Sequence, residues 1–253
     1  MLDSMYIAAI GLQAQKEQLD AAANNLANIN TTAFKRQSVD FAAILDRAPA
    51  GNAIEATDGG EARPARVLRF DSSAGKINAT GRALDVAIAG PGFIEVALPG
   101  DKVGYSRAGS LQINPEGMLS LASGHVLKAD IQVPSDATNV RILGDGSVSA
   151  LLAGDEQPTV LGQIELAAFD NPESLVYRGE GIFTAAGEIE PRRARPGEDG
   201  VGELETQSLE ASNVDMVDEM VSLLMMQRVY ELNSRVAQVA DEMMGMSNNL
   251  RRG

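Results

Sequence analysis

The chain has 253 residues, a formal net charge of −14, an aromatic content of 4% and no cysteine. Its length allows one large domain or two smaller ones with real cores, and the low aromatic content argues against a core built on aromatic anchors. The acidic balance argues against binding to nucleic acid or anionic lipid, and the lack of cysteine excludes disulfides and Cys-based zinc sites.

Residues 1–30 contain no proline and predict a long amphipathic helix. Apolar or small residues recur three and four positions apart, interrupted by Lys16, as in a heptad repeat. These residues are Leu2, Met5, Ala9, Leu12, Leu19, Ala23 and Leu26. The asparagines from Asn24 to Asn30 predict that the helix ends there. Residues 1–10 contain Asp3 and no basic region, which is unlike a cleavable secretory signal, and no run of about 18 apolar residues predicts a membrane span.

Residues 51–80 are polar and rich in Gly and Ala, and they predict either a flexible loop or a short strand pair. From 84 to 185, short apolar runs alternate with turn signals, which predicts a mostly antiparallel all-β domain. The expected strands include 84–88, 93–98, 104–106, 111–113, 118–121, 126–128, 140–143, 148–152, 160–169 and 182–184. Residues 186–204 are polar again and contain two prolines and four glycines.

The pattern is helical again from about Leu209 to Leu250, with Ser212 or Asn213 as the expected N-cap. The apolar seam has a stutter around Met225. Its members are Val214, Val217, Val221, Met225, Val229, Leu232, Val236, Val239, Met243, Met246 and Leu250. The two terminal helices offer more apolar surface than one partner helix covers, which predicts head-to-tail packing of identical copies. An intramolecular helical hairpin packed on the β domain remains the alternative.

The expected fold class is α+β, with long N- and C-terminal helices forming a coiled-coil-like core and a mostly antiparallel all-β middle domain. We expect five divisions along the chain. They are an N-terminal helix and signature loop (1–36), an extended loop or short strands (37–80), a β domain (81–185), a linker (186–208) and a C-terminal helix (209–253).

No motif for catalysis, cofactor binding or metal binding stands out, so we expect no enzyme, no cofactor and no metal. The single histidine, His125, lies beside Gly124 without a nucleophile signature, and Gly90-Pro91-Gly92 does not fit a phosphate loop. Asp and Glu are plentiful, so composition alone does not exclude a catalytic pair of carboxylates. A carboxylate hydrolase with helical oligomerisation arms and a secreted adhesin therefore remain alternatives.

Several blocks of the chain resemble the axial proteins of the bacterial flagellum, in particular the basal-body rod protein family. They are residues 23–36 (ANNLANINTTAFKR), 84–93 (LDVAIAGPGF), 105–110 (YSRAGS), 210–215 (EASNVD) and 227–234 (QRVYELNS). Ala33 stands where the family usually has Gly. The last block is most similar to the distal-rod branch, whereas Thr80-Gly81-Arg82 would also suit a proximal rod protein. The motif residues are Asn24, Asn25, Leu26, Ala27, Asn28, Thr32, Phe34, Ser212, Asn213, Gln227, Arg228, Tyr230, Glu231 and Asn233.

The resemblance implies a structural subunit of a hollow rod that transmits torque from the motor to the hook. The terminal helices would pack in concentric tubes, with the β domain outside. The implied assembly interface comprises Leu2, Met5, Leu12, Leu19, Leu26, Val214, Val217, Val221, Met225, Val229, Leu232, Val236, Val239, Met243 and Met246.

The implied partners are copies of the chain, other rod and hook proteins, and surrounding ring proteins as a further candidate, with no nucleic acid and no membrane insertion. The resemblance places the protein in the periplasm-spanning rod of the basal body. Export would use the flagellar type III apparatus without a cleavable signal. A proximal rod or hook-type protein is the alternative within the class.

Overall fold

A computed structural model describes residues 2–39, 68–100, 102–154, 157–185 and 189–250. The chain forms two compact units. The helical unit contains residues 1–27, 36–71 and 214–253, and the β unit contains residues 28–35 and 72–213.

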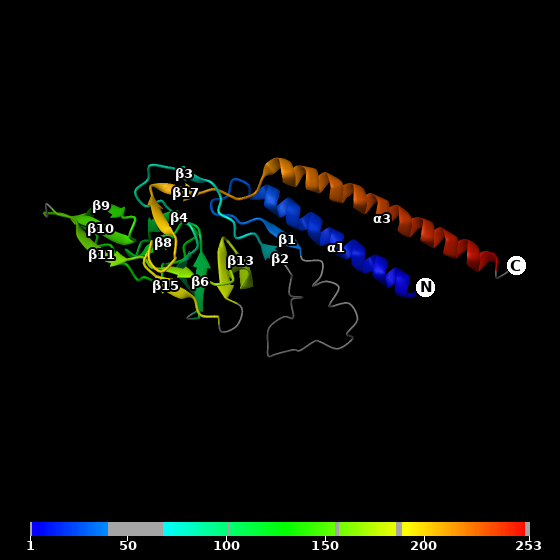
Figure 1. Cartoon of the computed structure of the whole chain (residues 1–253), viewed down its shortest axis with the longest axis horizontal. Helices are drawn as coiled ribbons and strands as arrows, with labels where there is room; N and C mark the ends of the chain where they lie inside the picture. The colour runs from blue at the N-terminus through cyan, green and yellow to red at the C-terminus, as the bar shows by residue number, and fades with distance from the viewer. Residues whose placement is uncertain (1, 40–67, 101, 155–156, 186–188, 251–253) are drawn as a thin grey trace. The chain divides into compact units, whose positions relative to one another are not determined.

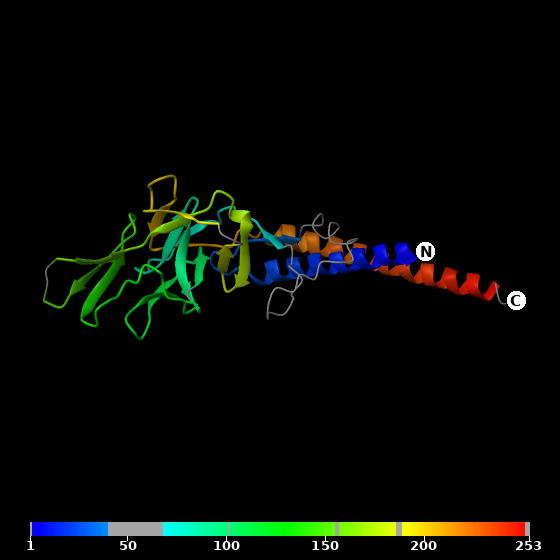
Figure 2. The same cartoon turned by 90° about the horizontal axis from the view of Figure 1, so that it is seen from below.

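Two long helices dominate the helical unit. Helix α1 (Leu2–Ala27) ends where the asparagine-rich stretch begins, and α3 (Met216–Leu250) runs antiparallel beside it (Figures 1 and 2). Strands β1 (Gln37–Val39) and β2 (Leu68–Phe70) form an antiparallel pair, and β1 packs against α1. None of the described helices is both long enough and apolar enough to cross a bilayer.

A six-stranded antiparallel sheet forms the centre of the β unit, in the order β13-β14-β6-β5-β12-β15. Its strands are β5 (Phe93–Leu98), β6 (Lys102–Ser106), β12 (Leu166–Ala168), β13 (Leu175–Gly179), β14 (Ile182–Ala185) and β15 (Arg192–Ala194). The 3-10 turn η1 (Pro172–Ser174) leads into β13. A three-stranded sheet contains β9 (Ala137–Ile142), β10 (Ser147–Leu152) and β11 (Thr159–Gln163), with β10 in the centre.

Three strand pairs complete the β unit. Strand β3 (Ile77–Ala79) pairs with β17 (Ser208–Glu210), β4 (Val86–Ala89) pairs with β16 (Glu203–Thr206), and β7 (Leu111–Ile113) pairs with β8 (Leu119–Leu121). Strands β15 and β16 thus lie in the segment expected to be a linker, and β17 crosses the expected boundary between that linker and the C-terminal helix. The expected strand at 160–169 is divided into β11 and β12, and the expected strand at 126–128 makes only isolated bridges.

The hydrophobic core of the β unit is mainly aliphatic, built from alternating residues such as Val86 and Ile88 on β4 and Ile94 and Val96 on β5. Aromatic residues also gather there, although the sequence argued against this. Five of the ten aromatic residues of the chain, Phe93, Tyr105, Phe169, Tyr177 and Phe183, form ring contacts with centroid separations of 4.8 to 6.0 Å. The low aromatic content of the whole chain did not predict this local cluster.

The expected fold class is wrong. The described residues form two α-helices and seventeen strands, all paired antiparallel, so the chain is predominantly a β protein. No coiled-coil-like core is seen in this part of the chain, because several described residues of the predicted seam of α3 are not covered by α1. Val217, Met225 and Leu232 of that seam are 68%, 64% and 61% exposed. The helix also begins later than expected, because residues 208–210 belong to β17.

Candidate assembly face and buried ion clusters

Helix α3 begins with a side-chain cap. The Asp215 carboxylate accepts hydrogen bonds from the backbone N–H groups of Val217 at 2.8 Å and Asp218 at 3.1 Å. These bonds satisfy donors that the first helical turn leaves without a partner. Asp215 therefore performs the capping role that the sequence assigned to Ser212 or Asn213.

Apolar residues form an exposed band along the first half of α3, which we call the α3 stripe. Most of its members recur three or four positions apart, so they share one side of the helix. The stripe consists of Val217, Met220, Val221, Leu224, Met225, Val229 and Leu232, all of which are exposed. An apolar band of this size on an exposed helix is typical of an interaction surface.

A different side of α3 contacts α1. Glu219 accepts a hydrogen bond from the Asn25 side chain at 2.9 Å, and Asn233 donates one to Gln15 at 2.8 Å. On α1, Ala14, Ala21 and Asn25 are buried. Polar side chains thus link the two helices, and Leu223 and Met226 of α3 are half-buried, whereas the other large apolar residues of its first half remain exposed.

The other residues of the predicted interface fall into two groups. Val214 is buried just before α3, and Leu19 and Leu26 are half-buried on α1. The remaining side chains lie outside those that the structure describes: Leu2, Met5, Leu12, Val236, Val239, Met243 and Met246. The assignment of the whole set to an assembly interface stays a prediction.

A polar cluster in the helical unit ties the end of α1 to β1 and to the start of α3. Asn25 accepts a hydrogen bond from the Gln37 backbone N–H at 2.8 Å and donates one to the Gln37 carbonyl at 2.8 Å. Arg36 Nε lies 2.6 Å from Glu219 Oε1, the oxygen that also accepts from Asn25. The motif residue Asn25 is therefore a buried structural connector.

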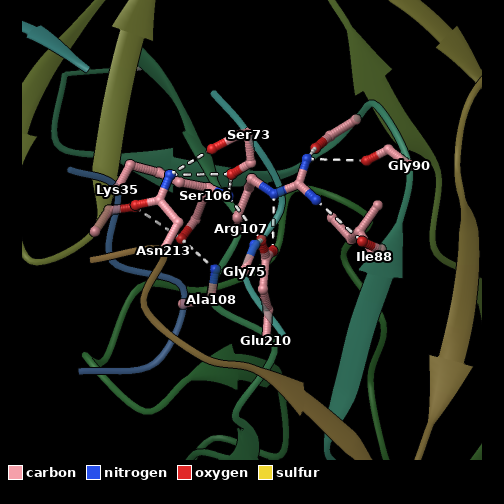
Figure 3. A network of polar contacts seen from close by, with 12 residues as sticks. Lys35, Ser73, Gly75, Ile88, Gly90, Ser106, Arg107, Ala108, Glu210 and Asn213 are labelled. Atoms are coloured by element: carbon pink, nitrogen blue, oxygen red, sulfur yellow. Dashed lines mark hydrogen bonds and ion pairs between the residues drawn. The ribbon is translucent and has the colours of Figure 1, made fainter. Parts of the chain in front are cut away.

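A buried ion network in the β unit joins three distant blocks of the sequence (Figure 3). Lys35 Nζ lies 2.6 Å from Glu210 Oε1, and Arg107 Nε lies 2.9 Å from Glu210 Oε2. Lys35, Arg107 and Glu210 are 3%, 4% and 1% exposed. We call these three residues the Glu210 network.

Backbone groups satisfy the remaining donors and acceptors of the Glu210 network. The Gly75 N–H donates to Glu210 at 2.8 Å, and Lys35 donates to the Ser73 carbonyl at 2.6 Å. The guanidinium of Arg107 donates to the carbonyls of Ile88, Gly90 and Gly92 at 3.0 to 3.1 Å. These carbonyl dipoles partly offset the second positive charge, because the network contains two cations and one anion.

Glycine at position 75 allows this arrangement. A Cβ atom there would lie 2.0 Å from the carbonyl oxygen of Ala211, which is closer than any two such atoms can approach. The backbone of Gly75 can therefore approach the segment after Glu210 only without a side chain.

Burial alone would raise the pKa of Glu210, but the charges of Arg107 and Lys35 and the hydrogen bonds from Lys35 and Gly75 outweigh it, so the pKa is lowered. Burial likewise opposes a lowered pKa at Asp85. Hydrogen bonds from Arg82 and Thr80 and the charge of Arg82 outweigh burial there too, and the pKa of Asp85 is also lowered.

We expect the protein to lose stability in acid. A carboxylate whose pKa is lower in the folded than in the unfolded state contributes stability above its unfolded pKa and loses it as pH falls through the folded pKa. For Glu210 and Asp85 this loss begins below about pH 4.5, near the ordinary carboxyl values. Urea unfolding between pH 3 and pH 7 measures it, and Glu210→Gln should flatten the profile.

The signature loop (Asn28–Lys35) is fixed to the same network. The Ala33 N–H donates to the Glu210 carbonyl at 2.8 Å, and the Asn213 N–H donates to the Phe34 carbonyl at 3.3 Å. Ala33 and Phe34 are buried, and Ala33 has a φ of +56°. Ala33, which stands where the family usually has Gly, therefore adopts a left-handed backbone conformation that favours glycine.

We expect Ala33→Gly to raise the free energy of unfolding by about 0.5–1 kcal/mol, because it relieves a left-handed backbone conformation. The lost methyl burial and the greater freedom of glycine in the unfolded chain limit the gain. The matched control is Ala23→Gly at an exposed position of α1, which should lower stability by about 1 kcal/mol. Urea titrations followed by circular dichroism would test both, and a destabilised Ala33→Gly protein would contradict the explanation.

The other motif residues are mostly at the surface. Asn28 accepts a hydrogen bond from Thr31, and the Asn213 side chain donates to Ser73. Leu26 and Ser212 are half-buried, and Arg228 lies 3.6 Å from Glu231. The remaining motif residues are exposed: Asn24, Ala27, Thr32, Gln227 and Tyr230.

Sequence reasoning did not assign roles to Lys35, Asp85, Arg107, Glu210 or Glu219. The first four lie inside blocks quoted for the family resemblance, and their charge in otherwise apolar or glycine-rich surroundings was a usable signal. Glu219 carried no such signal, because the first turns of a helix often contain acidic residues.

No group of three or more His, Cys, Asp or Glu residues that could hold a metal ion is found in the described part of the chain. His125 lies 3.6 Å from Glu180 in a pair that is partly exposed to solvent. The charged clusters described above bind the chain to itself.

Comparisons with known protein families match three segments of the chain. Residues 5–35 match the flagella basal body rod protein model, and residues 87–150 match the flagellar hook protein FlgE/F/G D1 domain. Residues 205–250 match the C-terminal model of the flagellar basal body rod FlgEFG proteins. These models define the class as the axial proteins of the bacterial flagellum.

Full-length relatives narrow the class. The flagellar basal-body rod protein FlgG of Caulobacter vibrioides is 36% identical over 99% of this chain and 100% of its own length. FlgG of Bacillus subtilis is 34% identical over the whole of both chains, and that of Buchnera aphidicola from Acyrthosiphon pisum is 34% identical over 96% of this chain and 98% of its own. The chain belongs to the flagellar basal-body rod protein family and resembles its FlgG members.

Proposed function

We propose that this chain is a structural subunit of the distal flagellar rod that polymerises through its terminal helices. Full-length similarity to proteins named as flagellar basal-body rod proteins supports the structural role and the location in the basal body. The observation that carries the assembly mode is the α3 stripe, which α1 leaves exposed. Helices of neighbouring subunits would cover it.

The stripe suits packing among copies. Its apolar residues gain free energy when water is removed, at roughly 25 cal/mol per Å² of buried apolar area. Methionine, which occurs at Met220 and Met225, adapts to neighbours that meet it in different registers. A head-to-tail contact of this kind propagates as a filament.

The role we propose is mechanical. Many helix–helix contacts per subunit would make the rod stiff enough to transmit torque from the motor to the hook. The proposed partners are copies of this chain and the axial proteins adjoining them in the rod and hook. Catalysis and cofactors have no place in this function.

Cells that lack the native gene provide the test. We expect full-length chain to restore swimming and rods in isolated basal bodies, and a chain lacking residues 216–250 to be expressed but to restore neither. Normal swimming with the truncated chain would contradict assembly through α3. A tagged full-length subunit should also be found in the rod by electron microscopy, and its absence there would contradict the rod assignment.

A further inference from the structure

A groove of about 270 Å³ lies beside the signature loop in the β unit. On one side it is lined by the loop, including Thr31, Thr32 and Phe34. Its other walls come from the segments around Leu121, Tyr177 and Phe183, and most of its lining is apolar. We call it the loop groove.

A carboxylate, that of Glu180, lies at the rim of the loop groove, 3.6 Å from the His125 imidazole. Glu180 lines the groove in the short connection between β13 and β14, and its side chain is 73% exposed. Its φ is +53°, an unfavourable value for glutamate, between Gly179 and Gly181, which also have positive φ. Positive φ at Glu180 and Gly181 is the geometry of a two-residue hairpin turn, which holds the Glu180 side chain at the edge of the apolar groove.

A second surface lies on one face of the three-stranded sheet, where Arg141 and Leu143 also line a pocket shared with Thr206. Ser149 of β10 pairs with Val160 on β11 and with Arg141 on β9, so these three side chains lie in one row on one face. Val160 is 65% exposed, and Arg141 and Leu143 are exposed as well. We call Arg141, Leu143 and Val160 the outer patch.

The loop groove and the outer patch lie at opposite ends of the β unit. In Figures 1 and 2 the β9–β10–β11 sheet is at the end remote from β13, whose residue Tyr177 lines the loop groove. A contact between such surfaces on two copies is heterologous, so it repeats from copy to copy without closing into a dimer.

We propose that the loop groove receives the outer patch of a second copy of this chain. Val160 and Leu143 would enter the apolar groove, and Arg141 would pair with Glu180 at its rim. The inference rests on the proposed function, because only a polymer presents the two surfaces to each other at every step. Apolar character and opposite charge fit the same pair of surfaces.

The absence of cysteine makes a disulfide test specific. We would combine Val160→Cys with Ser123→Cys, an exposed residue that lines the loop groove, and oxidise isolated basal bodies that contain the full-length variant. A disulfide needs Cα atoms within about 7 Å of each other, so it forms only across a close contact. We expect a ladder of dimers, trimers and longer products on a non-reducing gel.

The controls separate this contact from general proximity. Each single-cysteine variant should give no ladder, and Ser123→Cys combined with Arg192→Cys, an exposed residue of β15, should give none either. The proposal is overturned if intact rods of the Val160/Ser123 variant give no ladder or if the Arg192 control gives an equal one. A product with a foreign protein at Ser123→Cys would overturn it in favour of another occupant.

Charge exchange provides an independent measurement. In the background of the cysteine pair, we expect Arg141→Glu or Glu180→Arg to lower the crosslink yield about two- to five-fold, the effect of an exposed ion pair. The double exchange should restore the yield, because it recreates the pair with reversed signs. Equal crosslink yields in the cysteine-pair protein, the two single charge exchanges and the double exchange would overturn the proposed Arg141–Glu180 ion pair. Swimming cells without a ladder would reject this contact and leave the rod function standing.

Discussion

Glu210→Gln is expected to lower the free energy of unfolding by about 3–5 kcal/mol, because it leaves Lys35 and Arg107 buried without an anion. All three side chains are almost completely buried, so water cannot replace the lost carboxylate. For a unit of this size the melting temperature should fall by roughly 6–20 °C. Thermal unfolding followed by circular dichroism would measure it.

Two comparisons make the prediction specific to the charge. Glu205→Gln, at an exposed position of β16, should change stability by less than about 0.5 kcal/mol. Lys35→Met should cost less than Glu210→Gln, about 2 kcal/mol, because it removes hydrogen bonds but leaves Arg107 paired with Glu210. If Lys35→Met proved the more damaging change, the network would not depend on Glu210 as its only anion.

Met225→Glu on the α3 stripe is expected to abolish rod assembly while leaving the isolated protein as stable as before. Met225 is 64% exposed in the single chain, so a charge there remains hydrated and costs little. Inside a polymer the same charge would be buried without a partner, which costs several kcal/mol. We expect assembly to weaken at least about 100-fold at roughly 1.4 kcal/mol per factor of ten.

The matched control uses the same position. Met225→Leu keeps the apolar surface and nearly the same volume, and it should assemble normally. Swimming and rod-containing basal bodies would be counted for both variants, and their melting temperatures compared. Normal rods with Met225→Glu would show that this part of the α3 stripe stays exposed in the polymer.

The two charged clusters join segments that lie far apart in the sequence, and the Glu210 network joins three of the blocks that carry the family resemblance. Lys35, Arg107 and Glu210 belong to the N-terminal, middle and C-terminal blocks, and they meet only in the folded β unit. Asn25 and Glu219 are 194 positions apart and meet in the helical unit. The motif residues Asn25 and Phe34 thus hold the chain together, whereas Tyr230 is exposed and remains a candidate contact with neighbouring subunits.

Local pattern predicted the elements that depend on local interactions. The three- and four-residue spacing of apolar side chains predicted helical segments at both ends, and the alternation around Val86 and Ile94 predicted strands. The departure at Ala33 was also visible in the sequence. The conformational cost of Ala33 was not visible in the sequence, because its positive φ is known only from the folded loop.

Only the tertiary structure decided which face of each helix is used and which strands pair. The heptad pattern of α3 placed Val217 and Met225 on one face without deciding whether α1 or a neighbouring copy covers it, and in the structure Glu219 and Asn233 contact α1 instead. Likewise β16 and β17 pair with β4 and β3, more than a hundred residues earlier in the chain. Their short polar sequences gave no local sign of this pairing. Spacing along a chain fixes which side chains share a face, but the choice of what that face meets depends on long-range contacts that no local pattern contains.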